Sequence, residues 1–233
     1  MVETTIYLSM KKIIINESQF KILLEMSDIY DKCNRWITNG YIVHGTNAKF
    51  NEFSPAFIQG GARAKEGYGI YFTDTAYKAI EYGQIIKAVP KDKFNFIELT
   101  ESVEYGSQLY NQLFGNEEKR KELEYEIENL MNDGRYREAL DLYKEIDKLG
   151  DSDGVLYGPL RDKCLLAIET YGAKNLGSLQ DKLINPNANL PLLAQVLKVL
   201  GYDGGHYGNV YTIWNFEKLK ENLIDITESD NII

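Results

Sequence analysis

A chain of 233 residues with 44% hydrophobic residues is long enough to bury the core of one large domain or two small ones. Its formal charge of −9 argues against nonspecific binding to a phosphate backbone, although a small basic surface at Arg63 and Lys65 is compatible with it. No stretch approaches the roughly eighteen apolar residues of a membrane span, and the first residues lack the apolar block of a signal peptide. We therefore expect a cytoplasmic protein with no membrane partner.

Cysteine and histidine are scarce. Cys33 and Cys164 lie far apart in helix-like surroundings, which is typical of reduced thiols. Neither has the spacing of a zinc ligand, and the only histidines are His44 and His206. We therefore expect no metal cofactor.

The first half of the chain alternates short strands with helices. Apolar residues at helical spacing predict a helix over 17–37, with Asn16 as its N-cap and a break before Trp36, and a second helix over 75–86. Runs rich in β-branched and aromatic residues predict strands. The predicted strands are 11–16, 40–46, 69–74 and 94–99.

The composition of the sequence changes at residue 115. Residues 115–151 are rich in charge and carry two apolar stripes on either side of an Asn132-Asp133-Gly134 turn, which predicts a helical hairpin. Its second half resembles one helix of a tetratricopeptide repeat, but such arrays need about three repeats and only one copy is present. We expect a lone hairpin, within a helical insertion of about 103–172, that serves as a lid or a partner surface.

The last third returns to mixed elements. Helices are predicted over 159–172 and 190–201, a turn over 202–209, a strand over 210–216, and the start of another helix at "FEKLK". Because no linker rich in Pro, Gly or Ser interrupts the chain, residues 1–233 are expected to form a single domain with one insertion.

Three short motifs bear on function. They are "VHGT" at the end of a predicted strand, "GYGIYFTD" with its helix "TAYKAIEYG", and "GYDGGHYGNVYTIWNFEKLK" near the end of the chain. Taken singly, each has a plain structural interpretation. His44 fits a hydrogen-bonded core histidine, Tyr71 fits a core aromatic residue of a strand, and "GYDGG" fits a turn after a helix.

Together and in this order, the motifs resemble those of the diphtheria-toxin-like and poly(ADP-ribose)-polymerase-like ADP-ribosyltransferases, in particular the bacterial and phage members found in polyvalent proteins. The resemblance covers residues 41–83 and 198–220, about a third of the chain. It implies an α+β fold with a split β-sheet core that carries the helical hairpin as an insertion. It also implies that NAD is the substrate.

The resemblance assigns a role to each matching residue. His44 would hydrogen-bond the adenosine ribose, Gly45 would offer its backbone N–H and C=O to the nicotinamide carboxamide, and Thr46 takes the family's Ser/Thr position. Tyr71 and Tyr82 would stack on opposite faces of the nicotinamide. Each such aromatic contact contributes about 1 kcal/mol.

Further positions of the second motif match or depart from the family. Gly67 and Gly69 would let the backbone run close beneath the dinucleotide. Lys78 matches a lysine of the same branch, and we include it among the cofactor-binding residues. Ala79 replaces a serine that contacts the carboxamide in many members, so one nicotinamide contact is missing.

The third motif departs more seriously. The family's strand often carries a glutamate that grips the 2′-hydroxyl of the nicotinamide ribose and stabilises the transition state. Aligned through Tyr211, that position is Val210. The missing group would come from Asn209, from His206, from Glu217 if the register differs, or from the acceptor itself.

The resemblance therefore predicts a mono-ADP-ribosyltransferase that transfers one ADP-ribose to a macromolecular acceptor. Its candidate catalytic residues are His44, Tyr71 and Asn209. The acceptor is a protein side chain or a nucleic acid. An intracellular bacterial or phage effector, such as the toxin of a toxin–antitoxin or phage-defence system, is the expected setting, and the helical insertion would bind an antitoxin, inhibitor or chaperone. The alternatives are a module that binds NAD or ADP-ribose without chemistry, because of Val210, and a pure interaction protein without NAD affinity.

Overall fold

The computed structural model describes residues 4–8, 11–15, 17–54, 68–115, 117–149, 154–156, 158–183 and 189–227. Asn16, Arg63, Lys65 and Gly67, which the sequence singles out, lie outside these ranges. The prediction of a mixed helix and strand protein is confirmed. Among the described helices, none combines the length and the apolar composition needed to cross a membrane.

Seven of the described strands form one open mixed sheet, in the order β6-β7-β8-β4-β3-β5-β9. Neighbouring strands are antiparallel except β6 and β7, which run parallel. The strands are β3 (Tyr41–Thr46), β4 (Ile70–Thr73), β5 (Ile85–Pro90), β6 (Phe96–Glu98), β7 (Gly204–Tyr207), β8 (Val210–Ile213) and β9 (Ile224–Asp225).

Helices α1 (Glu17–Thr38) and α2 (Ala76–Tyr82) cover one face of the sheet, which we call the α2 face. The side chains of Trp36, Val43 and Ala79 are buried there. Helix α9 (Phe216–Asn222) packs on the opposite face, the α9 face, where Phe72 and Tyr211 are buried. Because side chains alternate along a strand, each strand contributes to both cores.

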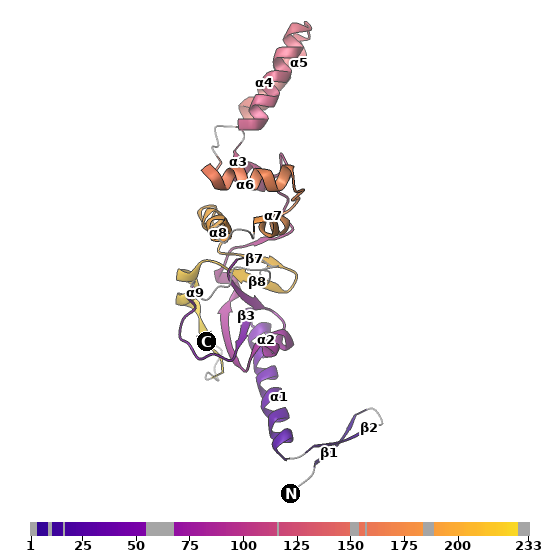
Figure 1. Ribbon diagram of the computed structural model, residues 1–233, viewed down its shortest axis with the longest axis vertical. Helices are drawn as coiled ribbons and strands as arrows, with labels where there is room; N and C mark the ends of the chain where they lie inside the picture. Colours follow the sequence, from indigo (N-terminus) through magenta and orange to yellow (C-terminus); the bar gives the residue numbers. More distant parts are fainter. Residues whose placement is uncertain are drawn as a thin grey trace.

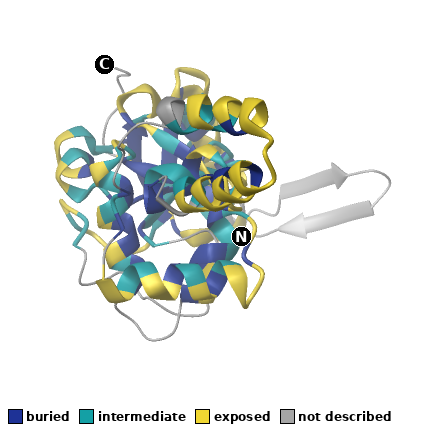
Figure 2. Cartoon of the chain, turned by 90° about the horizontal axis from the view of Figure 1, so that it is seen from above, coloured by how far each residue is buried: buried dark blue, intermediate teal, exposed yellow. Residues whose placement is uncertain are grey.

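The largest buried cluster lies beside the sheet. It is formed by α3 (Gln108–Phe114), α6 (Gly158–Glu169), α7 (Leu176–Leu183) and α8 (Asn189–Val199), together with Trp214, which follows β8. Figure 1 shows these helices stacked next to the sheet, and Figure 2 shows the buried residues gathered in the middle of the molecule. Two helices of the predicted insertion, α3 and α6, therefore belong to the main core.

Helices α4 (Glu117–Asn132) and α5 (Tyr136–Leu149) form the predicted hairpin and project from one end of the molecule (Figure 1). They bury a small cluster of their own that includes Ile127 and Ala139. The segments before and after the hairpin are in direct contact, because the Leu156 N–H donates to the Leu113 carbonyl at 2.8 Å. The hairpin is therefore inserted without separating its two flanking segments.

A second projection lies at the other end (Figure 1). Strands β1 (Thr4–Leu8) and β2 (Lys11–Ile15) pair antiparallel with each other and form a separate two-stranded sheet next to the start of α1.

Three local predictions were wrong. The break predicted before Trp36 is absent, since α1 runs without interruption from Glu17 to Thr38. The helix predicted over 75–86 ends at Tyr82, because Gly83 has a φ of 158° and β5 begins at Ile85. The turn predicted over 202–209 contains strand β7, whose sequence GGHY lacks the apolar alternation of a strand. This strand is held by its neighbours, since β6 pairs with one edge of it and β8 with the other.

Candidate functional site

The three sequence motifs lie on three adjacent strands. The order β8-β4-β3 places the third, second and first motif side by side, although the chain between β4 and β8 runs from Thr73 to Val210. Short strands of one sheet thus bring together residues that are far apart in the sequence. The residues predicted as a site lie on these strands or, for Gly69, just before β4, on α2, and in the turn between β7 and β8.

Strands β3 and β4 pair at a single register position, Val43 opposite Thr73, and the ladder does not continue to Gly45 opposite Tyr71. We call this unpaired end of the ladder the opening between β3 and β4. The backbone of Gly45 faces this opening. On the far side of β3, the Ile86 N–H donates to Thr227 Oγ1 at 2.7 Å and the Ile86 carbonyl accepts from the Ile226 N–H at 3.0 Å. Both polar groups of Ile86 thus point away from Gly45, its register partner. In an antiparallel ladder, the N–H and C=O of Gly45 must then point toward β4.

His44 bridges the opening with its side chain. Its Nδ1 lies 2.6 Å from the carbonyl oxygen of Tyr71. Because a carbonyl oxygen only accepts, Nδ1 carries the proton and donates. Burial lowers the pKa of His44, an effect that the hydrogen bond to Tyr71 opposes and the charge of Lys87 reinforces. The ring is therefore neutral at pH 7, and its Nε2 is a hydrogen-bond acceptor.

Aromatic rings surround His44 on the α9 face. Phe53 meets the imidazole edge to face at 4.9 Å between ring centroids, and Phe72 lies at 5.6 Å. Lys87, although only 4% exposed, is neutralised by Asp225, whose Oδ2 accepts from its Nζ at 2.6 Å. These contacts fix the ring, and neither Lys87 nor Asp225 was predicted from the sequence.

Gly45 is required by packing as well. A Cβ at this position would lie 1.7 Å from the carbonyl oxygen of Ala79 in α2. A Cβ on Gly83, at the end of the same helix, would lie 2.1 Å from the backbone carbonyl carbon of Thr46. The helix therefore rests directly on the end of β3, and the absence of a side chain at residue 45 has a structural reason independent of any ligand.

Tyr71 and Tyr82 both belong to the α2 face, but they differ in exposure. Tyr71 is partly buried and lies opposite Thr212 on β8, whereas Tyr82, in the last turn of α2, is 74% exposed. Gly69, with a φ of 142°, would place a Cβ 2.5 Å from the carbonyl oxygen of Ile213, so it too is needed for strand packing. The Thr46 hydroxyl accepts from the Ala48 N–H at 3.1 Å and stabilises a local turn.

Lys78 and Asn209 form a polar cluster with two threonines. Lys78 Nζ donates to Asn209 Oδ1 at 2.8 Å, and Asn209 Nδ2 donates to Thr75 Oγ1 at 2.7 Å. The Thr73 hydroxyl donates to the backbone carbonyl of Asn209 at 2.9 Å. The sequence offered no signal for the two threonines, because their partner is more than 130 residues away.

Val210 lies beside this cluster. It is opposite Thr73 in the β4–β8 ladder and partly exposed. Cross-strand partners share a face, so Val210 projects on the α2 face with Thr73 and Tyr71.

The other two residues considered for the missing group lie elsewhere. His206 stacks on Tyr211, with ring centroids 5.6 Å apart, on the α9 face, and its Nε2 is 3.7 Å from Glu98. The Glu217 carboxylate is 83% exposed and accepts from Lys198 at 2.6 Å. Of the three, only Asn209 is part of the cluster beside Val210.

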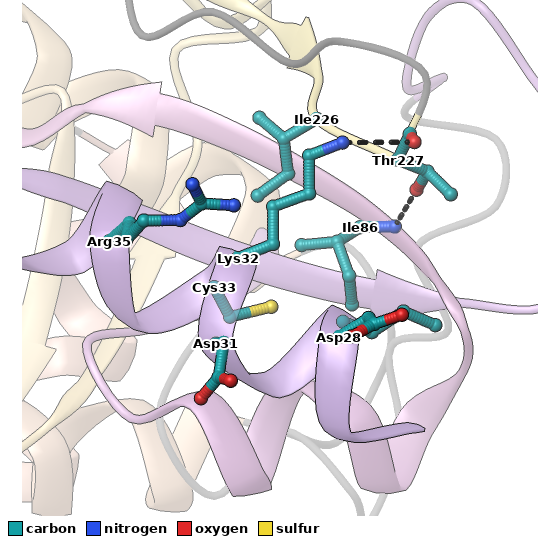
Figure 3. A pocket seen from close by; sticks show the side chains of 9 residues that line it. Asp28, Asp31, Lys32, Cys33, Arg35, Ile86, Ile226 and Thr227 are labelled. Atoms are coloured by element: carbon teal, nitrogen blue, oxygen red, sulfur yellow. Dashed lines mark hydrogen bonds between the residues drawn. The ribbon is translucent and has the colours of Figure 1, made fainter. Parts of the chain in front are cut away.

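A hollow of about 450 Å³ lies away from these residues (Figure 3). Asp31, Lys32 and Arg35 of α1 line it together with Ile86 and Thr227. Figure 3 shows Lys32 reaching across to donate to the Thr227 carbonyl at 3.2 Å. Since this contact fixes the segment that follows β9 against α1, the hollow is a junction between α1 and the sheet edge. It contains none of the predicted site residues.

Cys33 and Cys164 are both buried and carry free thiols. Burial raises the pKa of Cys33 to about 11 and that of Cys164 to about 12, so neither thiol ionises at neutral pH. Within the described ranges, no three histidine, cysteine or acidic side chains are grouped as metal ligands.

No protein-family model, curated protein or solved structure matches this chain. Its function is therefore inferred from the motifs and from the geometry of the residues that they contain.

Proposed function

We propose that this chain is a mono-ADP-ribosyltransferase, which cleaves NAD and transfers one ADP-ribose to a protein or nucleic-acid acceptor. The observation that supports this most is the opening between β3 and β4, toward which Gly45 directs an N–H donor and a C=O acceptor. A primary carboxamide offers the complementary acceptor and donor on one edge. The nicotinamide of NAD carries such a group.

The surroundings of the opening suit the remainder of NAD. The neutral His44 has an acceptor at Nε2, which would take a hydrogen bond from a ribose hydroxyl. Tyr71 projects on the same face as Gly45, and Tyr82 lies on α2, the helix that covers this face; a cationic pyridinium would gain dispersion and cation–π energy against such rings. In the reaction the bond from ribose C1′ to the pyridinium nitrogen breaks, nicotinamide leaves with the electron pair, and the acceptor bonds to C1′.

Val210 favours a second candidate, a module that binds NAD or ADP-ribose without cleaving it. A valine side chain neither donates nor accepts a hydrogen bond, so the electrostatic assistance of the family's glutamate is missing at this position. A pure interaction protein is the third candidate, and it predicts no NAD affinity.

Two measurements separate these candidates. Calorimetry with NAD is expected to show saturable binding, and its absence would leave only the interaction protein. Chromatography of the reaction mixture is expected to show nicotinamide release that depends on the protein. Binding without release would establish the binding module. Long ADP-ribose polymers would refute the mono-transferase.

We also propose that the protein acts inside a bacterial or phage-infected cell as an effector or toxin, with a cognate antitoxin, inhibitor or chaperone on the α4–α5 hairpin. Labelled NAD incubated with a whole-cell lysate, followed by protease, DNase or RNase on parallel samples, identifies the class of acceptor. Label removed by one treatment alone assigns the acceptor to that class.

A further inference from the structure

The surroundings of Val210 carry a positive charge. Lys78 Nζ is held by Asn209 Oδ1 at 2.8 Å, and the amide of Asn209 is oriented by its second hydrogen bond, to Thr75. In the described part of the chain, no carboxylate pairs with Lys78. Two acids lie within one helical turn of Lys78 along the chain: Glu81 belongs to none of the ion pairs of the described residues, and Asp74 accepts from the Tyr211 hydroxyl on the α9 face. The ammonium group is therefore fixed but not neutralised by the residues that hold it.

The same cluster contains no general base. Its members are two hydroxyls, one amide and one ammonium group, none of which takes up a proton at neutral pH. Val210 adds no polar atom. An acceptor that must lose a proton to become a nucleophile, such as a hydroxyl or an amide, would find no group in this cluster to remove it.

We infer that Lys78 and Asn209 form an oxyanion subsite for the acceptor, so that ADP-ribose is transferred to a carboxylate or a phosphate. This inference rests on the proposed transferase function. In the reaction, a lone pair of the oxyanion forms the bond to ribose C1′ while the bond from C1′ to nitrogen breaks. The electron pair stays on nicotinamide, which leaves neutral, and the acceptor oxygen loses its negative charge. No proton is transferred, so no base is needed.

Charge balance supports the same conclusion. The ribose becomes more positive as the bond to nicotinamide breaks, and an ammonium group nearby opposes this change. An oxyanion bound beside Lys78 offsets the repulsion between the ammonium group and the ribose, and from that position it attacks ribose C1′. Cleavage of NAD is therefore expected to depend on the acceptor, with slow hydrolysis in its absence.

Matched acceptors test the inference directly. A glutamate-containing peptide is compared with its glutamine twin, and an oligonucleotide with a 5′-phosphate with its 5′-hydroxyl twin, each with labelled NAD. We expect one oxyanionic acceptor to take up label at least tenfold faster than its neutral twin, and the pair that responds identifies a carboxylate or a phosphate as the source. Equal labelling of neutral and oxyanionic twins would overturn the subsite.

Variants connect this preference to the cluster. Asn209→Asp neutralises Lys78 with little change of shape, and Lys78→Gln removes its charge. Both are expected to raise the KM for the oxyanionic acceptor at least tenfold, and to affect the KM for NAD less. Lys93→Gln, which removes one exposed charge in the turn after β5, is the matched control and should behave as the unmodified protein. An effect of the same size in all three variants would assign it to net charge.

A binding experiment without NAD separates this inference from the proposed function. Inorganic phosphate and acetate are titrated into the whole protein while the side-chain amide signals of Asn209 are followed by NMR. We expect a saturable shift with at least one anion, and its loss in Lys78→Gln. No saturable shift with either anion would overturn the subsite even if NAD is cleaved. A shift in a protein that does not bind NAD would retain the subsite and refute the transferase.

Discussion

His44 is held in one tautomer by the carbonyl oxygen of Tyr71, 2.6 Å from its Nδ1. Burial lowers its pKa below the ordinary value of 6.5, so the folded protein keeps the ring neutral at a pH where the unfolded chain has begun to take up a proton. The proton on Nδ1 leaves Nε2 free to accept. Burial thus sets the charge of the group that we propose contacts ribose, and the hydrogen bond to Tyr71 sets its tautomer and orientation.

The lowered pKa predicts a pH dependence of stability. Below about pH 6.5 the unfolded state binds more protons at residue 44 than the folded state, so the free energy of unfolding falls as the pH falls. Asp203 and Asp225, whose pKa values are lowered from 3.8, titrate well below this range. Denaturant unfolding at pH 7, 6 and 5 should show a steeper loss for the unmodified protein than for His44→Asn, which keeps a donor to Tyr71. Parallel curves would contradict the shift.

Tyr71 tests the stacking proposal. Tyr71→Ala should weaken NAD binding at least tenfold, whereas Tyr71→Phe should retain most of it, because the ring supplies the dispersion and cation–π energy. Calorimetric titration of the three proteins with NAD measures the difference. If Phe and Ala are equally damaging, the hydroxyl matters and the stacking interpretation is wrong.

Val210→Glu introduces the carboxylate that the ADP-ribosyltransferases resembling this chain often carry at the matching position. Since Val210 is partly exposed beside the Lys78–Asn209 pair, the new carboxylate gains a nearby cation, and we expect a change in unfolding free energy within about 1 kcal/mol. Nicotinamide release should be unchanged or faster. A carboxylate buried without a partner would instead cost several kcal/mol. Thermal unfolding together with a nicotinamide assay distinguishes these outcomes.

At the level of elements, the site depends on how closely α2 approaches β3. The helix carries Lys78 and Tyr82, and its backbone at Ala79 leaves no room for a Cβ on Gly45. The β3–β4 ladder is registered only at Val43 opposite Thr73, and the N–H and C=O of Gly45 point toward β4. The position of Gly45 is therefore determined both by the packing of α2 against β3 and by the end of the β3–β4 ladder.

Gly45→Ala tests this arrangement. A Cβ 1.7 Å from a backbone oxygen forces α2 away from the sheet, at a cost of about 1–3 kcal/mol or more, and should abolish NAD binding. Gly177→Ala in α7 is the matched control, because a Cβ there would lie 3.3 Å from its nearest neighbour, the Leu99 carbonyl oxygen. Its effect on the free energy of unfolding should stay within about 1 kcal/mol. Denaturant unfolding and NAD calorimetry of both variants provide the comparison. Equal stability of the two would contradict the packing reason for Gly45.

At the scale of the whole molecule, the α4–α5 hairpin stands apart from the body that carries the site (Figure 1). One side of α5 packs against α4, and its other side exposes Tyr136, Leu140 and Tyr143, which are spaced as one stripe along a helix. This stripe is the surface to which we assign the proposed antitoxin, inhibitor or chaperone.

Excision of the hairpin separates its role from that of the body. Residues 116–153 can be replaced by a short Gly–Ser linker, because Gly115 and Gly154 already lie against each other. We expect the shortened protein to fold, with NAD affinity within about twofold, since shortening a closed loop changes its entropy only slightly. Calorimetry and thermal unfolding measure this. A pull-down in which the shortened protein keeps every partner would refute a docking role for the hairpin.

Local patterns were enough to predict several elements. The apolar spacing of α1, the aromatic and β-branched content of β3 and β4, and the paired stripes of α4 and α5 are each contained within one segment of chain, so the sequence predicts them correctly. The candidate residues His44, Gly45 and Tyr71 were found in the same way, by motif, and their roles toward NAD stay predictions.

Other features depend on contacts between distant residues. Strand β7 forms because β6 and β8 lie on either side of it, the carbonyl of Tyr71 bonds to a histidine 27 residues earlier, and Lys78 meets Asn209 across 131 residues. No local pattern encodes such pairs, because the free energy that holds them comes from the packed sheet and its helices and not from the segments themselves. The residue types at the site were therefore readable in the sequence, whereas the opening at Gly45 and the unneutralised charge beside Val210 emerge only when the strands are placed next to one another.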